Sequence, residues 1–187
     1  MSNQLLITIG GASANGKSTL ARSLHARFND NSQKTMLIDS DLMRKVLWYS
    51  AQSESNFDEK VTLPVEAYSS EFGERTYQAM YKNALFALRR GFNVIVDATF
   101  LDAGQRQKFV ELAMQQRAEH KGIWLENEQS VLEQRADARE KGISDATGFV
   151  VGLQFKKDFG DVSGWAKIRT DKTAADTLKK AIKALKI

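Results

Sequence analysis

Cysteine is absent from this chain of 187 residues, and proline occurs once, as Pro64. The lack of thiols excludes disulfide bonds, cysteine-based catalysis and cysteine-ligated metal centres, and it suits a reducing compartment. Histidine occurs only twice, as His25 and His120, which argues against a histidine-rich metal site. No proline-rich or low-complexity stretch marks a linker. We therefore expect a single domain over residues 1–187.

Long hydrophobic runs are also absent, since no apolar segment approaches the ~20 residues of a membrane-spanning helix. The first strand-like segment begins near residue 5, which leaves no room for a signal or transit peptide. We therefore expect a cytoplasmic protein without membrane contact. The net charge of +4 is concentrated late in the chain, around 172–186. A docked helix with a solvated lysine face explains this charge, and the lack of interleaved aromatic residues disfavours nucleic acid as a partner without excluding it.

Apolar segments of strand length alternate with segments of helical periodicity along the chain. Strands are predicted at 5–9, 35–38, 93–97, 122–125 and 165–169. Helices are predicted between them and after the last strand, including one over about 65–90, one over about 128–141, and one from Ser144 or Asp145 to about Phe159. Buried strands separated by helices imply an α/β fold, with a five-stranded parallel sheet and helices on both faces. Ligands of such sheets collect at the carboxyl ends of the strands.

The stretch from residue 11 to residue 18, GASANGKS, matches the pattern G-x-x-x-x-G-K-S completely. A strand precedes it and a helix follows, which is the context that this motif requires. Gly11 and Gly16 permit a backbone whose N–H groups point at an anion, while Lys17 can reach the β- and γ-phosphates and Ser18 can ligate Mg²⁺. The motif predicts a site for a nucleoside triphosphate with Mg²⁺. The residues expected to hold the nucleotide here are Gly11, Ala12, Ser13, Ala14, Asn15, Gly16, Lys17, Ser18 and Thr19.

Three aspartates follow the second and third predicted strands, at the edge where ligands collect. Asp41 is the candidate general base, which would accept the proton of a substrate hydroxyl. Asp39 is a candidate for holding a water molecule of the Mg²⁺ shell, and the alternative is that it caps the following helix. Asp97 is expected to contact the metal shell or the acceptor, because a buried carboxylate at a strand end is costly without such a partner.

Arginines supply candidate positive charge for the transferring group. Arg44 lies one helical turn after Asp41 and either clamps an anionic acceptor or lies at the surface. Arg135 and Arg139 are four residues apart on one predicted helix. They could close over the phosphates and stabilise transition-state charge, and the alternative is that they pair with neighbouring glutamates in a solvated helix.

Taken together, these segments resemble the kinase-type P-loop proteins near polynucleotide kinase, zeta toxin, chloramphenicol phosphotransferase, and the gluconate and shikimate kinases. The resemblance is strongest to an uncharacterised "predicted kinase" family, and it extends from residue 5 to about 170. The matching runs are GASANGKST (11–19), DSDLMR (39–44), NVIVDATFLDAGQR (93–106), LEQRADAR (132–139) and GISDATGFVVGLQ (142–154).

This resemblance implies a P-loop NTPase three-layer sandwich and an ATP- and Mg²⁺-dependent kinase. In the sugar and shikimate kinases the D-x-D run pairs a metal-shell aspartate with a catalytic base, which here would be Asp39 and Asp41. In the polynucleotide-kinase-like branch the base and the acceptor-phosphate arginine would be Asp41 and Arg44. The family lid would span about 128–145 and carry Arg135 and Arg139.

Two further regions follow from the same resemblance and from the local composition. Arg169 falls in the region that packs beside the adenine in the resembling kinases. Residues of about 50–75 are a candidate substrate-facing insertion. The run that contains Ser144 and Asp145 is typical of the predicted-kinase family, but the resemblance assigns it no role.

Three functional hypotheses remain at this point. The leading one is a kinase that transfers the γ-phosphate to a hydroxyl of a small molecule. The first alternative is a kinase of a nucleotide-sugar or a nucleic-acid 5′-hydroxyl, and the second is a nucleotide-dependent ATPase switch. The chain contains no N-K-x-D guanine motif, which argues against a GTPase. The sequence indicates neither the acceptor nor an oligomeric state.

Overall fold

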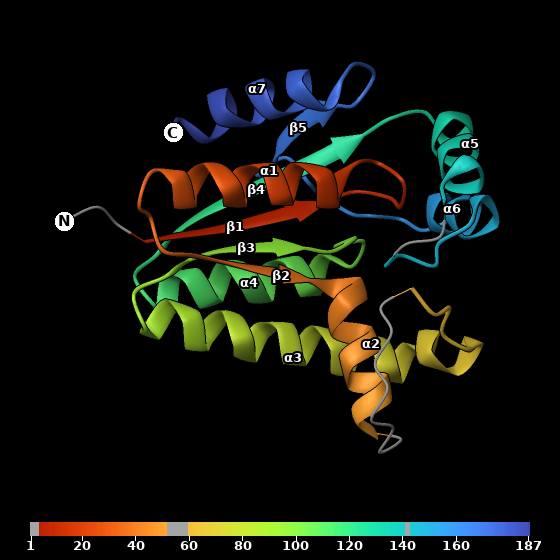
Figure 1. The fold of residues 1–187 in the computed structure, drawn as a ribbon, viewed down its shortest axis with the longest axis horizontal. Coiled ribbons are helices and arrows are strands. Elements are labelled where there is room, and N and C mark those ends of the chain that lie inside the picture. The colour runs from red at the N-terminus through yellow and green to blue at the C-terminus, as the bar shows by residue number, and fades with distance from the viewer. Residues whose placement is uncertain (1–3, 52–59, 141–142) are drawn as a thin grey trace.

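The computed structural model describes residues 4–51, 60–140 and 143–187, and its centre is a parallel β-sheet (Figure 1). Five strands lie in the order β2-β3-β1-β4-β5, and every neighbouring pair is parallel. The predicted fold class is therefore confirmed. The strands are β1 (Leu5–Gly10), β2 (Thr35–Asp39), β3 (Asn93–Asp97), β4 (Glu119–Glu126) and β5 (Ala166–Arg169).

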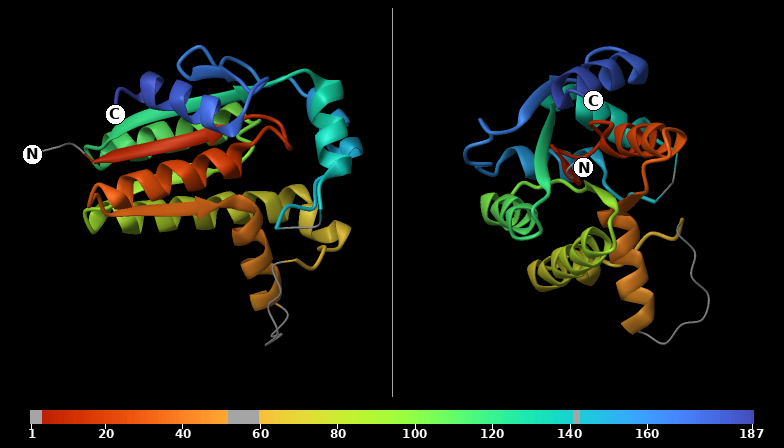
Figure 2. Two further views of the ribbon diagram at one scale, coloured as in Figure 1. Left: turned by 45° about the horizontal axis from the view of Figure 1, so that its top comes forward. Right: turned by 90° about the vertical axis from the view of Figure 1, so that its left-hand side faces the viewer.

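Helices cover both faces of this sheet, as the end-on view in Figure 2 shows. One face carries α1 (Lys17–Asp30) and α7 (Ala174–Leu185), and the other carries α3 (Ser70–Arg89) and α4 (Ala103–Gln115). The remaining helical elements lie beyond the carboxyl ends of the strands (Figure 1). These are α2 (Ser40–Ala51), the 3₁₀ turn η1 (Val65–Tyr68), α5 (Gln129–Ala138) and α6 (Gly148–Phe155). No helix in the described ranges is long and apolar enough to cross a membrane.

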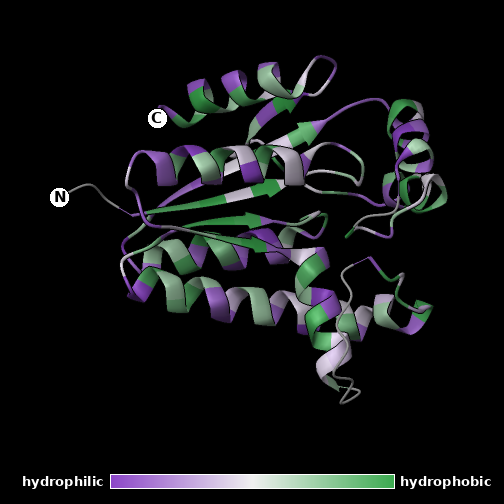
Figure 3. Ribbon diagram, in the orientation of Figure 1, coloured by the Kyte–Doolittle hydropathy of each residue, from purple (hydrophilic) through white to green (hydrophobic). Residues whose placement is uncertain are grey.

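The two faces of the sheet bury different side chains, because alternate residues of a strand point to opposite sides. Ile7 and Ile9 of β1 pack with the aliphatic residues of α1 and α7. Leu6, on the opposite face, belongs to a cluster rich in aromatic rings that includes Phe109 and Trp124. The strands are accordingly the most continuously hydrophobic part of the ribbon in Figure 3. Burial on both faces explains the apolar runs seen in the sequence.

The strand order reverses around β1, and this reversal creates the ligand-binding edge. The chain passes from β1 to the outer strand β2, returns to β3 between them, and then crosses to β4 on the far side of β1. Ile9 of β1 lies beside Asp97 of β3, and the Gly11 amide still donates to the Thr99 carbonyl, so the phosphate loop leaves β1 next to the segment that leaves β3. Open α/β sheets bind their ligands in the crevice at such a reversal.

Several predicted element boundaries differ from the structure. The helix expected over about 65–90 is broken at Ser69, whose hydroxyl accepts from the Phe72 amide and caps α3. The helix expected to start at Ser144 or Asp145 and to reach Phe159 begins at Gly148 and ends at Phe155, so that prediction is wrong. Helix α5 ends at Ala138, short of the predicted limit near 141.

Part of the predicted insertion lies outside the described residues. Residues 52–59 of the expected 50–75 region are not described, nor are 141–142 of the expected lid. Within the described part, residues 50 and 51 close α2, and η1 and the start of α3 follow from Val65.

Candidate active site

The loop between β1 and α1 is shaped by its glycines. Gly11 has a φ of +126° and Gly16 a φ of +81°, and a Cβ on Gly11 would lie 2.2 Å from the carbonyl oxygen of Leu125. Asn15 fastens the loop to the same carbonyl through a 2.6 Å hydrogen bond from its Nδ2. Gly16 is the N-cap of α1, and no side chain caps the helix. The first N–H groups of α1 therefore remain available to an anion.

Lys17 and Ser18 lie at the floor of a cavity of about 450 Å³. Lys17 is buried, and its Nζ donates to the Ala12 carbonyl over 2.9 Å. Burial lowers the pKa of Lys17, while the nearby carboxylate of Asp97 opposes this shift. The hydroxyl of Ser18 donates to the Asp97 carboxylate. The loop thus presents a buried ammonium and a hydroxyl to one wall of the cavity.

Asp97 closes the bottom of this cavity from the end of β3. Its side chain is 3% exposed, and burial raises its pKa to about 7 in spite of the charge on Lys17. Asp39, at the end of β2, also lines the cavity, and burial raises its pKa. One oxygen of Asp39 accepts from the amides of Asp41 (2.9 Å) and Leu42 (3.1 Å). Asp39 therefore caps α2 and faces the cavity at the same time.

The oxygen groups of this cavity fit a magnesium ion. Ser18, Asp39 and Asp97 supply a hydroxyl and two carboxylates. Mg²⁺ favours oxygen ligands and keeps several of its waters, so one or two protein groups suffice beside the phosphates. Over the residues that the structure describes, no group of three or more His, Cys, Asp or Glu side chains forms an all-protein metal cage.

Asp41 and Arg44 diverge although both belong to α2. Asp41 lines the cavity, and its charge acts on both Lys17 and the hydroxyl of Tyr68. Arg44 is not among the residues that line the cavity. Its Nη1 donates to the Ala67 carbonyl over 2.7 Å, and its guanidinium lies 5.1 Å from the centre of the Tyr68 ring. The structure therefore brings Asp41 to the phosphate loop and holds Arg44 against η1.

Both predicted lid arginines line the cavity. Arg139 donates from Nη2 to the carbonyls of Ser144 (3.0 Å) and Ala146 (2.9 Å). Arg135 donates from Nη2 to the Thr170 carbonyl over 2.9 Å. Neither arginine forms an ion pair with another residue of the described chain. Their side chains are thus held by backbone carbonyls with their charges left uncompensated.

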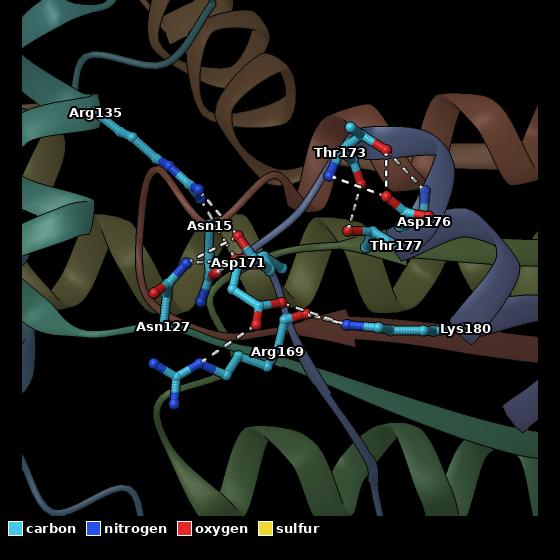
Figure 4. Close-up of polar contacts among 10 residues, drawn as sticks. Asn15, Asn127, Arg135, Arg169, Asp171, Thr173, Asp176, Thr177 and Lys180 are labelled. Atoms are coloured by element: carbon cyan, nitrogen blue, oxygen red, sulfur yellow. Dashed lines mark hydrogen bonds and ion pairs between the residues drawn. The ribbon is translucent and has the colours of Figure 1, made fainter.

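A second cavity, of about 160 Å³, adjoins the first on the α7 side. Arg135 and Asn15 contribute to both cavities, and Thr170 and Thr177 line only the second. Figure 4 shows Arg135 reaching from α5 toward Asn15.

Arg169 lines neither cavity, although the family resemblance places it beside the nucleotide. It forms an ion pair with Glu128 over 2.7 Å and lies 3.9 Å from Asp171, the latter pair being visible in Figure 4. The next residue, Thr170, contacts the phosphate loop instead, through a 2.5 Å hydrogen bond to Asn15.

Gln154, for which the sequence patterns predicted no role, contacts the phosphate loop from α6. Its Oε1 accepts from the Ser13 amide (2.8 Å), and its Nε2 donates to the Ser13 hydroxyl (3.0 Å). Arg22, one turn after Ser18 on α1, lines the cavity and was also missed. Gln154 belongs to the run at 142–154 that the family resemblance singled out, as does Asp145. That run was the sequence signal that could have indicated a functional role for Gln154.

Comparison with known proteins gives a family and a set of related folds. A family model described as an AAA domain matches residues 6–154. No protein of curated function matches the sequence. The gluconokinase of Sinorhizobium meliloti 1021 superposes with a TM-score of 0.67 at 15% identity, covering 100% of this chain and 94% of that one.

Two further solved structures share the fold. The APS kinase CysC of Mycobacterium tuberculosis, in complex with AMPPNP and APS, has a TM-score of 0.63 at 14% identity and covers 100% of both chains. A sugar kinase from Janibacter sp. HTCC2649 has a TM-score of 0.64 at 13% identity, covering 100% of this chain and 96% of that one. Identities this low show the fold alone. The P-loop kinase fold is therefore confirmed, and membership of the narrower "predicted kinase" family stays a prediction.

Proposed function

This chain belongs to the AAA domain family, and we propose that it is an ATP- and Mg²⁺-dependent kinase that phosphorylates a hydroxyl of a small molecule. One observation carries the proposal. A single cavity collects Lys17 and Ser18 from the phosphate loop, Asp41 from α2, Arg135 from α5 and Arg139 from the residue that follows α5. These are the groups that phosphoryl transfer needs: a phosphate cradle, a base for the acceptor, and positive charge over the transferring group.

Asp41 acts as the general base in this proposal. It takes the proton of the acceptor hydroxyl while that oxygen bonds to the γ-phosphorus and the bond from phosphorus to ADP breaks. Its place in the cavity that Lys17 and Ser18 also line supports this role, because the acceptor hydroxyl must reach the γ-phosphate there. Arg135 and Arg139 stabilise the charge on the transferring group, and Lys17 holds the β- and γ-phosphates.

Ser18, Asp39 and Asp97 would hold Mg²⁺ or its water shell. When bound, the ion neutralises charge on the β- and γ-phosphate oxygens. The smaller cavity between Asn15, Arg135 and Thr170 would receive the nucleobase. In this proposal Arg169 supports Thr170 from outside the cavity, and Asp97 serves the metal shell rather than the acceptor.

The proposal also covers the organisation of the chain. Residues 1–187 form one kinase domain with a lid at about 128–145 and an acceptor-facing region at about 50–75, in a cytoplasmic protein. The names of the related folds support a small acceptor, because gluconokinase, APS kinase and sugar kinase each denote a kinase of a small molecule.

The test measures ATP consumption by the wild type and by Asp41→Asn against sugars, nucleosides, nucleotide-sugars, antibiotics and 5′-hydroxyl oligonucleotides. Asp30→Asn is the matched control, because it makes the same change at an exposed position at the far end of α1. We expect turnover with a small hydroxyl compound to fall ~10²–10⁴-fold in Asp41→Asn, with ATP binding kept, and to persist in Asp30→Asn.

Other outcomes would redirect the proposal. Turnover only with nucleotide-sugars or oligonucleotides would favour the kinase alternatives related to zeta toxin and polynucleotide kinase. Acceptor-independent hydrolysis that is equal in the wild type and Asp41→Asn would contradict a base role for Asp41 and favour an ATPase switch.

A further inference from the structure

The carboxylate of Asp145 joins three segments that are distant in sequence. Its Oδ1 lies 3.3 Å from the Nζ of Lys45 on α2. Its Oδ2 accepts from the Leu63 amide (3.0 Å) and from the hydroxyl of Tyr68 on η1 (2.5 Å). The side chains of Lys45 and Asp145 are only 1% and 7% exposed. A buried ion pair that also satisfies an amide and a hydroxyl fixes the relative position of the segments that supply it.

The backbone on either side of Asp145 holds Arg139. The guanidinium of Arg139 donates to the carbonyls of Ser144 and Ala146, the two residues that flank Asp145. Ser144 itself lines the phosphate cavity together with Arg139. Because both carbonyls move with the residue between them, the attachment of Asp145 to Lys45 sets where Arg139 points.

Lys45, the ion-pair partner of Asp145, lies on the same helix as Asp41. The two residues are four apart on α2, so they lie about one helical turn from each other. Figure 1 shows α2 and η1 on one side of the carboxyl edge of the sheet, and α5 and α6 on the other. The Lys45–Asp145 pair is therefore a direct link between the helix that carries Asp41 and the segment that holds Arg139.

We propose that Asp145 is a positioning residue for phosphoryl transfer, which through its buried pair with Lys45 fixes Arg139 over the terminal phosphate at a set distance from Asp41. The inference rests on the proposed function, since it needs a terminal phosphate for Arg139 to contact. Such a link matters because phosphoryl transfer requires the base and the charge-stabilising arginine to be correctly positioned at the same time. Asp145 acts through Arg139 and does not touch the reacting atoms.

The test measures dissociation constants for Mg·ATP and Mg·ADP by calorimetry in four proteins: the wild type, Arg139→Gln, the pair exchange Lys45→Met/Asp145→Asn, and the combination of all three substitutions. The pair exchange removes both charges together, so neither is left buried alone, and the asparagine can still accept from Leu63 and Tyr68. Glu119→Gln is the control, because it breaks an ion pair with Lys121 at the start of β4, away from both cavities. Thermal melts establish that each variant is folded.

We expect Arg139→Gln to weaken ATP binding about tenfold and ADP binding less than twofold. The pair exchange should weaken ATP binding ~3- to 10-fold with the same selectivity, and the combination should bind ATP no more weakly than Arg139→Gln alone. Glu119→Gln should bind both nucleotides as the wild type does.

The outcomes separate the inference from the function on which it rests. If the pair exchange weakens ATP and ADP equally, or adds fully to Arg139→Gln, its role is structural and the inference is wrong. If Arg139→Gln loses ATP affinity while the pair exchange loses none, the inference alone is wrong. If the wild type binds no nucleotide, the proposed function fails and the inference fails with it. If Arg139→Gln changes neither affinity, Arg139 does not contact the bound terminal phosphate and the inference alone is wrong.

Discussion

The phosphate loop and a second part of the cavity lining, the opposite wall of Arg139, Ile143 and Ser144, obtain their shapes from different sources. The loop is one contiguous stretch, residues 11–18, whose path is set by glycines with positive φ at fixed positions. Its ammonium bonds within the loop, from Lys17 to Ala12. The opposite wall has no such local code, because its form depends on Asp145 meeting Lys45 across 100 residues and Leu63 across 82. A contiguous backbone motif can be predicted from the sequence. Contacts between side chains that are far apart in the sequence become evident only in the structure.

Asp97 lines the same cavity, and its buried carboxyl should give the largest effect in stability. Its pKa is raised from 3.8 to about 7, so in this window the folded state binds more protons than the unfolded state. The contribution of Asp97 to stability is therefore fully present below about pH 4, and it should be lost, by ~4 kcal/mol, as the pH rises from 4 through 7. In Asp97→Asn the free energy of unfolding should depend less on pH than in the wild type. A smaller dependence should remain, because the pKa of Asp39 is also raised. Urea denaturation from pH 4 to pH 8 measures both; equal slopes in the two proteins would contradict the assignment.

Lys17→Met changes the phosphate loop and leaves the opposite wall of the cavity unchanged. The substitution keeps the length of the side chain but removes the ammonium, so Mg·ATP affinity should fall about 100-fold. Helix α1 should persist, because methionine is a good helix former. Titration calorimetry together with circular dichroism checks both statements. Retained ATP affinity would show that the Lys17 ammonium does not contact the phosphates.

Gln154→Leu tests how the loop is fastened to α6. Leucine keeps a similar size but cannot pair with the amide and hydroxyl of Ser13. We expect about tenfold weaker ATP binding, since two hydrogen bonds that position the loop are lost. Val151→Ala provides the comparison, because it loosens the same helix against Leu132 without touching Ser13. Equal losses in the two variants would mean that α6 matters only through packing.

Arg169→Gln should give the smallest effect. The side chain is 54% exposed and pairs with Glu128 outside both cavities. Exposed pairs of this kind contribute little, so ATP affinity should change less than about twofold. A tenfold loss in fluorescence titration would instead restore the direct nucleotide contact that the sequence predicted.

The comparison of the two walls also explains what the sequence could predict. The alternation of apolar runs and helical periods predicted all five strands, because strands buried on both faces are continuous in hydrophobicity. It predicted the loop and the edge occupied by Asp39, Asp41 and Asp97 for the same local reasons. It failed at Asp145, which it used to start a helix, because an aspartate before an apolar run is also a helix cap. Only the distant Lys45 and Tyr68 distinguish the two uses.

The tryptophans offer a way to observe the two walls separately. Trp124 and Trp165 lie with ring centres 6.2 Å apart, and a Cβ on Gly10, the last residue before the phosphate loop, would meet Trp124 at 2.9 Å. Trp48 instead packs on Phe72, at 5.4 Å, on the α2 side. The chain contains only these three tryptophans. Its intrinsic emission therefore carries two signals, a coupled indole pair that senses the entry to the phosphate loop and a lone indole that senses the helix bearing Asp41.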